Sequence, residues 1–239
     1  LRKNNILNVA VYDDYKPISY YDKKSHKYKG IAVDLMDKLG EKLGIRFKYF
    51  AINTKDPYDM FNSTKTDIVL PVYVDDLMYY KTKSLFDSDI NYITKSSYGT
   101  LNDNARIAVV KKYKYISDCL KNKTKYNIVE YDTIEDACNG VNDGEVDAFA
   151  TSTYNAKFII QNPRYRKLDI REFDNISLPF GLAINNNSIL ESALNKGIQY
   201  ITSEERKNII DKDTAYKWSD LSWYDKLYSY IDILSFVSF

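Results

Sequence analysis

Two successive units of strand, helix and strand follow one another along the chain, and this order constrains the fold more than any other feature. The first unit consists of an apolar run at residues 6–12, an amphipathic helix that ends before Gly44, and an alternating run at residues 46–52. Strands that alternate with helices are typical of a parallel sheet covered by helices. The sequence therefore predicts an α/β fold.

The second unit starts afresh after residues 93–105, a connection with strand character that predicts a hinge and not a flexible tether. A later apolar run at residues 177–184 predicts one more strand. The elements of the second unit are a strand, helix, strand, helix and strand, at residues 106–110, 115–120, 127–131, 133–141 and 145–150. Helix starts are predicted by three pairs of a capping residue and a glutamate three positions later: Asp132 with Glu135, Ser188 with Glu191, and Thr202 with Glu205.

The two cysteines, Cys119 and Cys138, have neither metal-site spacing nor a CxxC motif, so free thiols are expected. If the strand order of the second unit is 2-1-3, right-handed crossovers place its two helices on opposite faces of the sheet, and these cysteines cannot meet. The single histidine, His26, lies in a charged, turn-like stretch. A histidine-based metal cluster is therefore excluded.

The charge balance argues against a nucleic-acid partner, because 34 basic residues face 33 acidic ones. The sequence contains no nucleophile elbow and no glycine-rich phosphate loop, so neither a cofactor nor catalysis is expected. Tyrosine is in excess, at 23 residues. Its ring can pack in a core or line a polar cleft, so the excess permits a binding site without proving one.

The C-terminal segment, residues 223–239, ends on an apolar run with Leu227, Ile231, Leu234 and Val237 at helical spacing. This pattern favours a helix that leads into a membrane, and a helix packed on its own domain is the alternative. No segment reaches the roughly 18 apolar residues of a membrane-spanning helix, and the N-terminus has no signal-peptide core. The chain as given is therefore expected to be soluble.

Four stretches carry a resemblance to a known family: "LNVAVYDDYKPISYYD", "TDIVLPVYVDD", "DGEVDAFATSTYNAKFI" and "LPFGLAI". In order and spacing they resemble the family 3 extracellular solute-binding proteins of the polar amino-acid-binding type, over residues 6 to about 215. The resemblance implies a type II periplasmic-binding-protein-like fold, a two-lobed Venus flytrap. Each lobe would be a doubly wound, mostly parallel sheet, with two hinge crossovers. The implied division is lobe 1 at 1–93 with 182–222, lobe 2 at 94–181, and a membrane-proximal helix at 223–239.

The resemblance also implies where a ligand would lie between the lobes. The aligned positions are Tyr12 and Tyr15 after the first strand, the backbone from Pro71 to Asp75, and the loop of Lys111, Lys112 and Tyr113. The predicted ligand-binding residues are Tyr12, Tyr15, Pro71, Tyr73, Asp75, Tyr79, Lys112, Tyr113, Ser152 and Tyr154.

At two aligned positions the chain departs from the family. Amino-acid binders place an arginine that clamps the α-carboxylate where this chain has Tyr79 or Tyr80, and an aspartate that holds the α-ammonium where it has Ser152, five residues after Asp147. Tyrosine cannot replace the bidentate, charge-assisted bonds of a guanidinium. The prediction is that free α-amino acids are not tight ligands and that a neutral polar or aromatic solute is favoured. The alternative is that the tyrosines pack between lobes and the pocket has degenerated.

The favoured function is the extracytoplasmic sensor domain of a membrane receptor, such as a histidine kinase or a cyclic-dinucleotide enzyme. The full-length receptor would be membrane-anchored through a segment after residue 239, and a dimer is possible. The alternative is the solute-binding protein of an ABC uptake transporter. A third reading is an enzyme like the cyclohexadienyl dehydratases of this fold. It is disfavoured because the acids near the expected cleft lie in solvated connections: Asp13, Asp14, Asp75 and Asp76.

Overall fold

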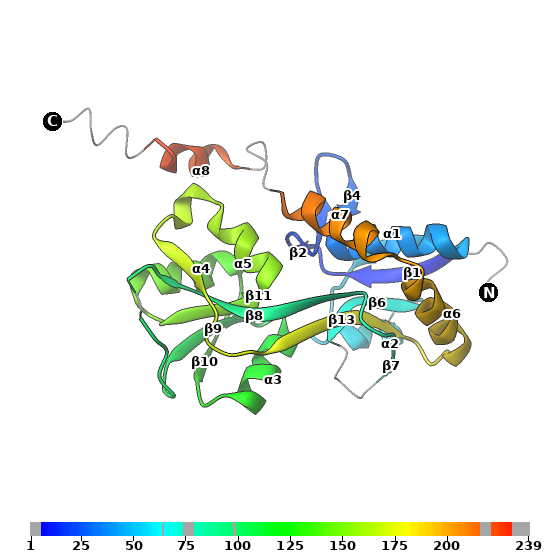
Figure 1. Ribbon diagram of the computed structural model, residues 1–239, viewed down its shortest axis with the longest axis horizontal. Coiled ribbons are helices and arrows are strands. Elements are labelled where there is room, and N and C mark those ends of the chain that lie inside the picture. The colour runs from blue at the N-terminus through cyan, green and yellow to red at the C-terminus, as the bar shows by residue number, and fades with distance from the viewer. Residues whose placement is uncertain (1–5, 64, 74–78, 98, 216–220, 231–239) are drawn as a thin grey trace. The chain divides into compact units, whose positions relative to one another are not determined.

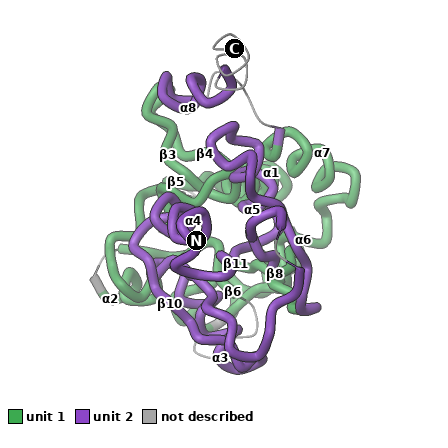
Figure 2. The backbone as a smooth tube through the Cα atoms, turned by 90° about the vertical axis from the view of Figure 1, so that its left-hand side faces the viewer, with its two compact units in different colours: residues 1–89, 176–214 green, residues 90–175, 215–239 purple. Residues whose placement is uncertain are grey.

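The computed structural model describes residues 6–63, 65–73, 79–97, 99–215 and 221–230. The chain divides into two compact units, coloured separately in Figure 2: unit 1 comprises residues 1–89 and 176–214, and unit 2 comprises residues 90–175 and 215–239. The chain therefore passes from one unit to the other three times. The boundaries between the compact units lie at 89/90 and 175/176. The lobe boundaries at 93/94 and 181/182 were predicted from the sequence and stay a prediction.

Unit 1 is built on a parallel sheet of the order 2-1-3. Strand β1 (Ile6–Val11) lies in the middle and pairs in parallel with β5 (Arg46–Ala51) and β6 (Ile68–Tyr73). The antiparallel strand β13 (Ser177–Ile184) extends the sheet beyond β6. The other elements are β2 (Asp14–Tyr15), β3 (Ser19–Asp22), β4 (Lys27–Lys29), α1 (Ile31–Leu43), the 3-10 turn η1 (Pro57–Asp59), α2 (Met60–Ser63), β7 (Tyr80–Lys81), α6 (Ser188–Gln199) and α7 (Ser203–Thr214).

Helix α1 shows why this sequence folds in this way. Its buried residues, which include Val33, Met36 and Leu39, lie on one helical face, and Gly44 ends the helix in the left-handed conformation at φ 67°. Helices α6 and α7 pack beside α1 (Figure 1). The predicted helix is thereby confirmed together with the residue that ends it.

Unit 2 repeats the 2-1-3 order, with β9 (Arg106–Val110) between β10 (Asn127–Tyr131) and β11 (Ala148–Ser152). Cys119 and Cys138 are free and buried, as expected from this order, and burial raises the pKa of the Cys138 thiol to about 12. The other elements are the C-terminal half of β8 (Phe86–Lys95), α3 (Lys114–Lys123), α4 (Ile134–Asp143), α5 (Thr153–Ile160), the 3-10 turn η2 (Pro163–Tyr165), β12 (Leu168–Arg171) and α8 (Trp223–Tyr228).

The expected separation into two sheets needs a correction, because the strands form one hydrogen-bonded path in the order β10-β9-β11-β8-β13-β6-β1-β5. Strand β8 causes this continuity. Its residues 86–89 pair with β13 in unit 1, and residues 90–95 pair with β11 and β12 in unit 2. A strand of ten residues without a break carries the ladder through both units.

Two of the three predicted capping pairs begin one residue away from the observed cap. The side chain of Thr133 accepts a hydrogen bond from the Asp136 amide at 3.0 Å, and that of Asn187 accepts one from the Leu190 amide at 3.0 Å. The Thr202 pair is confirmed, since the amide of Thr202 donates to Glu205 and the amide of Glu205 donates to the Thr202 hydroxyl, at 2.9 and 3.1 Å.

The predicted C-terminal helix is shorter in the described part of the chain. Helix α8 begins after Ser222, whose hydroxyl accepts from the Asp225 amide at 3.0 Å, and it includes Leu227. Ile231, Leu234 and Val237 lie outside the described residues. None of the helices in the described ranges has both the length and the apolar character that crossing a bilayer requires.

A prediction follows from the junction of α1 and α7. Glu205 accepts a hydrogen bond from Lys42 Nζ and one from the Thr202 amide, which together lower its pKa from the ordinary 4.5 to about 2. Because the folded-state pKa is depressed, this stabilisation is present above pH 4.5 and is lost as the pH falls through 2. We expect Glu205→Gln to flatten the fall in unfolding free energy across this window, measured by urea titration at successive pH values.

The matched control is Glu204→Gln, an exposed neighbour on the same helical turn. It should leave the acid slope as in the parent protein. Identical slopes for the two variants would contradict a linkage between Glu205 and folding.

Candidate functional site

In unit 1 the topology brings several predicted site residues to one edge of the sheet. Because β1 and β6 are parallel neighbours, their carboxyl ends lie at the same edge. Val11 is paired with Leu70, so Tyr12 follows β1 beside Pro71, and Tyr73 ends β6. In α/β sheets, ligands bind outside the carboxyl ends of the parallel strands.

Tyr12 and Tyr15 form a buried pair at this edge. They are 1% and 0% exposed, and their ring centroids lie 6.3 Å apart with an edge-to-face geometry. Burial raises the pKa of Tyr12 above its ordinary value, so its hydroxyl stays neutral across the physiological range. These two rings are packed into the unit and are not solvent-facing platforms.

Unit 2 assembles its predicted residues in the same way. Strands β9 and β11 are parallel neighbours, so the loop after β9 and the end of β11 lie at the same edge. Lys112 and Tyr113 follow β9, and Tyr113 is 2% exposed. Ser152 ends β11, and Tyr154 lies in the first turn of α5, where its side chain is half-buried. Each unit therefore gathers its own part of the predicted residue set.

Ser152, at the position that the resemblance aligns with an ammonium-binding aspartate, serves as a helix cap. It is fully buried, and its hydroxyl accepts a hydrogen bond from the Asn155 amide at 3.4 Å, at the N-terminus of α5. The neighbouring Thr151 donates to Asn155 Oδ1 at 2.8 Å. The position thus supplies a neutral oxygen and no carboxylate.

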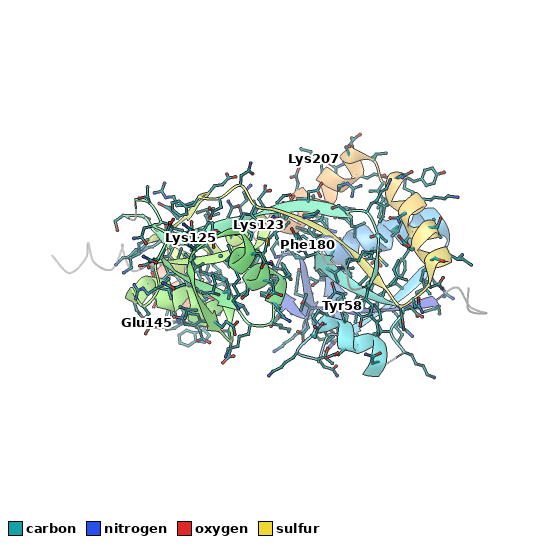
Figure 3. The ribbon with its side chains drawn as sticks, turned by 90° about the horizontal axis from the view of Figure 1, so that it is seen from below. Tyr58, Lys123, Lys125, Glu145, Phe180 and Lys207 are labelled. Atoms are coloured by element: carbon teal, nitrogen blue, oxygen red, sulfur yellow. The ribbon has the colours of Figure 1, made fainter. Side chains whose placement is uncertain are left out.

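Tyr79, which the resemblance aligns with a carboxylate-binding arginine, belongs to an aromatic cluster inside unit 1. Its ring stacks on Tyr58, with centroids 4.8 Å apart and planes inclined by 27°, and lies 5.2 Å from Phe61. Tyr58, labelled in Figure 3, is 8% exposed. One face of Tyr79 is therefore occupied by unit 1 itself. Asp75, another predicted residue, lies outside the described residues.

Lys81 is a cation near the expected site that was not among the predicted ligand-binding residues. It lies on β7, two residues after Tyr79, with its Nζ buried and 5.5 Å from the centroid of the Tyr58 ring. Its proximity in sequence to Tyr79 was the available signal, since a lysine can neutralise an anion as a point charge even where no guanidinium is present.

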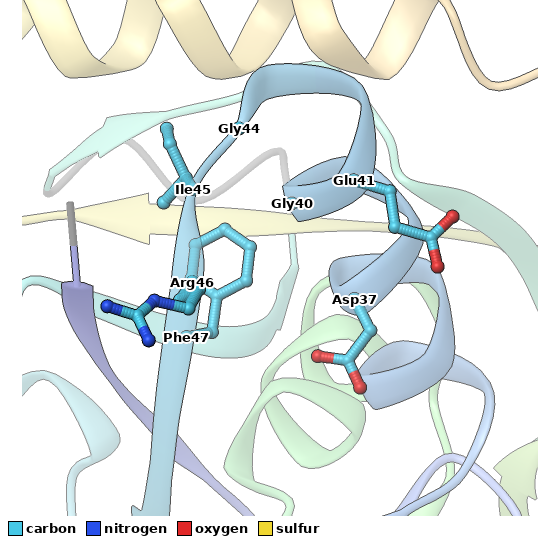
Figure 4. A pocket seen from close by; sticks show the side chains of 7 residues that line it. All are labelled: Asp37, Gly40, Glu41, Gly44, Ile45, Arg46 and Phe47. Carbon is cyan, nitrogen blue, oxygen red and sulfur yellow. The ribbon is translucent and has the colours of Figure 1, made fainter.

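A shallow groove in unit 1 lies away from the predicted residues in sequence. It has a volume of about 700 Å³ and is formed by α1 and the start of β5 (Figure 4). In Figure 4 the Glu41 carboxylate extends to the right and the Arg46 guanidinium to the left, so these two charged groups do not converge on a point between them. The lining residues are Asp37, Gly40, Glu41, Gly44, Ile45, Arg46 and Phe47. In the part of the chain that the structure describes, no three metal-ligating side chains form a cluster.

Comparisons with known proteins agree with this architecture. Residues 7–77 match the family model of the bacterial extracellular solute-binding proteins, family 3. No curated protein matches the chain. Among solved structures, the Bordetella pertussis BvgS periplasmic VFT2 domain is 18% identical, over 87% of this chain and 93% of that chain, with a TM-score of 0.75.

Two further structures represent different kinds of relative. An ancestral arginine-binding protein bound to arginine is 17% identical over 87% of this chain and 97% of that chain, with a TM-score of 0.70. A histidine kinase sensor domain with similarity to periplasmic binding proteins is 15% identical over 87% and 95%, with a TM-score of 0.72. At these identities the likeness establishes the fold.

Proposed function

We propose that this chain, which has the fold of the family 3 solute-binding proteins, is the extracytoplasmic ligand-binding domain of a membrane signalling receptor. It binds a small polar or aromatic solute, held between two lobes as the family resemblance implies. The similarity to a BvgS sensor domain and to a histidine kinase sensor domain supports this proposal. Closure around the solute shifts a two-state equilibrium by as much as the solute prefers the closed state.

The proposed class of ligand depends on the absence of charged side chains at two positions, Tyr79 and Ser152. Tyr79 stacks on Tyr58, and Ser152 is buried as a helix cap, so both positions are neutral. Burying a carboxylate or an ammonium without a partner costs several kcal/mol. A free α-amino acid is therefore a poor ligand, and solutes with an aromatic ring or several hydroxyls are better ones, because tyrosine offers a stacking face and a neutral hydroxyl.

The ligand-binding residues in this proposal are those that each unit gathers at the carboxyl edge of its strands, together with Tyr79 and Asp75. The buried rings of Tyr12 and Tyr15 support the site from within unit 1 and do not supply an exposed stacking face. Binding requires no cofactor. The reaction carried by some proteins of this fold needs an acid with a tuned pKa beside an anion clamp, and the neutral positions argue against such a reaction here.

A restoration experiment tests the role of the two neutral positions. We expect the double variant Tyr79→Arg with Ser152→Asp to gain glutamine affinity by at least about tenfold, because it returns one cation and one anion to the aligned positions. Arginine can stack on the aromatic rings beside position 79, and aspartate at position 152 can keep the capping bond from the Asn155 amide that Ser152 accepts. Isothermal titration calorimetry measures the gain.

The two single variants are the controls, because each restores only one end of the clamp. If the folded double variant binds glutamine no better than either single variant, these positions do not decide ligand class.

A solute-binding protein of an uptake transporter is the second candidate, favoured by the similarity to the substrate binding protein of an amino acid ABC transporter, at 16% identity and a TM-score of 0.71. The full-length gene separates the two. A membrane helix followed by a signalling domain after residue 239 supports the receptor, and a stop codon there refutes it.

A further inference from the structure

The chain returns to unit 2 after it has completed unit 1. Helix α7 belongs to unit 1, whereas α8 belongs to unit 2 and packs on the η2 turn. Its start is defined by a reciprocal pair in which the Ser222 hydroxyl accepts from the Asp225 amide, and the Asp225 carboxylate accepts from the Ser222 amide at 3.3 Å. The last described element is therefore attached to a different unit from the helix that precedes it.

Arg164 of η2 lies where three elements of unit 2 meet. Its guanidinium donates to Glu135 of α4 at 2.6 Å and lies 5.9 Å from the ring centroid of Tyr224 on α8. It also lies 5.7 Å from the ring of Tyr165 in its own turn. The Arg164 side chain is 21% exposed, so these contacts are partly shielded from water. A partly desolvated cation over an aromatic ring is a favourable contact.

Helix α8 is only partly covered by the rest of unit 2. Tyr224 and Tyr228 are four residues apart, and their rings meet edge to face at 5.5 Å on the side that carries the Arg164 contact. Trp223 and Leu227 are 75% and 49% exposed, and Tyr224 itself is 47% exposed. The contact with Arg164 is therefore a specific attachment of a short helix whose large side chains lie mostly in solvent.

We propose that Arg164 is the positioning residue that holds α8 on unit 2, so that residues 223–230 follow the movements of unit 2 although they come after the last helix of unit 1 in the chain. The signalling role of this attachment rests on the proposed receptor function: in a receptor, unit 2 would be the unit that transmits ligand closure to the segment that follows α8. The attachment itself is a property of the chain without ligand.

Hydrogen exchange tests the attachment. The amides of Lys226, Ser229 and Tyr230 are hydrogen-bonded within α8 and its last turn, and they report its docking. We expect Arg164→Gln to reduce their protection about fivefold, while the amides of β9 and β11 keep theirs. The control is Arg171→Gln, which removes another surface arginine of unit 2, paired with Asp169 at 3.8 Å, and should leave α8 unchanged.

Two further variants separate the contacts of Arg164. Glu135→Gln removes the ion pair and keeps the guanidinium over Tyr224, whereas Tyr224→Leu keeps an apolar side chain and removes the aromatic face. We expect Tyr224→Leu to reduce protection more, because Glu135 is 59% exposed and an ion pair with one partner largely in solvent contributes little. Unchanged α8 protection in Arg164→Gln, with the sheet intact, would overturn the proposal.

A distance measurement provides a second test that does not depend on exchange. Spin labels at Leu227→Cys and Lys157→Cys report the position of α8 against α5 of the same unit, and the two native cysteines are buried from the label. We expect a narrow distance distribution that broadens in Arg164→Gln, and a broad distribution in both proteins would refute docking. Neither test uses a ligand, so a failed ligand screen with docked α8 would refute the proposed function alone.

Discussion

Replacing Gly30 with alanine is expected to unfold unit 1, with a loss of more than about 4 kcal/mol of unfolding free energy. Gly30 has φ +116°, and an added Cβ would lie 2.5 Å from the Pro17 carbonyl oxygen and 2.6 Å from that of Ile18. These carbonyls accept hydrogen bonds from the Ile31 and Ala32 amides at 3.0 and 2.9 Å, so they cannot move without breaking the start of α1. Urea denaturation of the variant measures the loss.

Gly44→Ala is the matched control. Gly44 also has a positive φ, +67°, but an added Cβ would meet nothing within 4 Å. Only the left-handed conformation is then penalised, at about 1–2 kcal/mol. Equal losses for the two variants would show that backbone strain, and not the close approach to Pro17 and Ile18, requires Gly30.

Free amino acids are expected to bind very weakly. Glutamine, glycine and arginine should have dissociation constants of about 1 mM or higher, at least about 1,000-fold above a micromolar value, because roughly 4 kcal/mol of desolvation stays uncompensated. Tyr79 and Ser152 supply neither of the charges that a zwitterion needs. Isothermal titration calorimetry with these amino acids, beside a thermal-shift screen of nucleosides, sugars and short peptides, measures the difference.

Lys81 provides the sharpest way for this prediction to fail. If glutamine binds at micromolar concentration, and Lys81→Met abolishes binding while Lys83→Met does not, the buried ammonium beside Tyr58 is the carboxylate partner. The assignment to neutral ligands would then be wrong. Lys83 is a suitable control because its side chain is exposed and lies only two residues away.

The local elements could be predicted because each depends on short-range patterns. The apolar spacing of α1 and the glycine that follows it are sufficient to place that helix. The capping pairs show the limit of this reasoning, since Thr133 and Asn187 cap helices for which a neighbouring residue satisfied the same spacing. Adjacent polar residues compete for one cap, and backbone geometry decides between them.

The grouping of the candidate site residues depends on the order of the strands in the sheet. Tyr12 and Pro71 are brought side by side by the pairing of β1 with β6, which the family resemblance implied through the fold. The contact of the Lys81 ammonium with the Tyr58 ring and the stacking of Tyr79 on Tyr58 were not predictable, because they arise where β7 meets the η1 turn more than twenty residues earlier in the chain. No local pattern reports such a contact.

By itself, the sequence determined the α/β class, the repeated strand–helix–strand units and the two neutral residues in the expected site, because periodicity and residue type are local properties. Only the tertiary structure decided that β8 carries one ladder through both units and that α8 attaches to unit 2 through Arg164. Strand pairing and helix docking depend on which hydrogen-bonding groups and apolar surfaces, distant in sequence, still lack a partner. These partners are known only once the whole chain has folded.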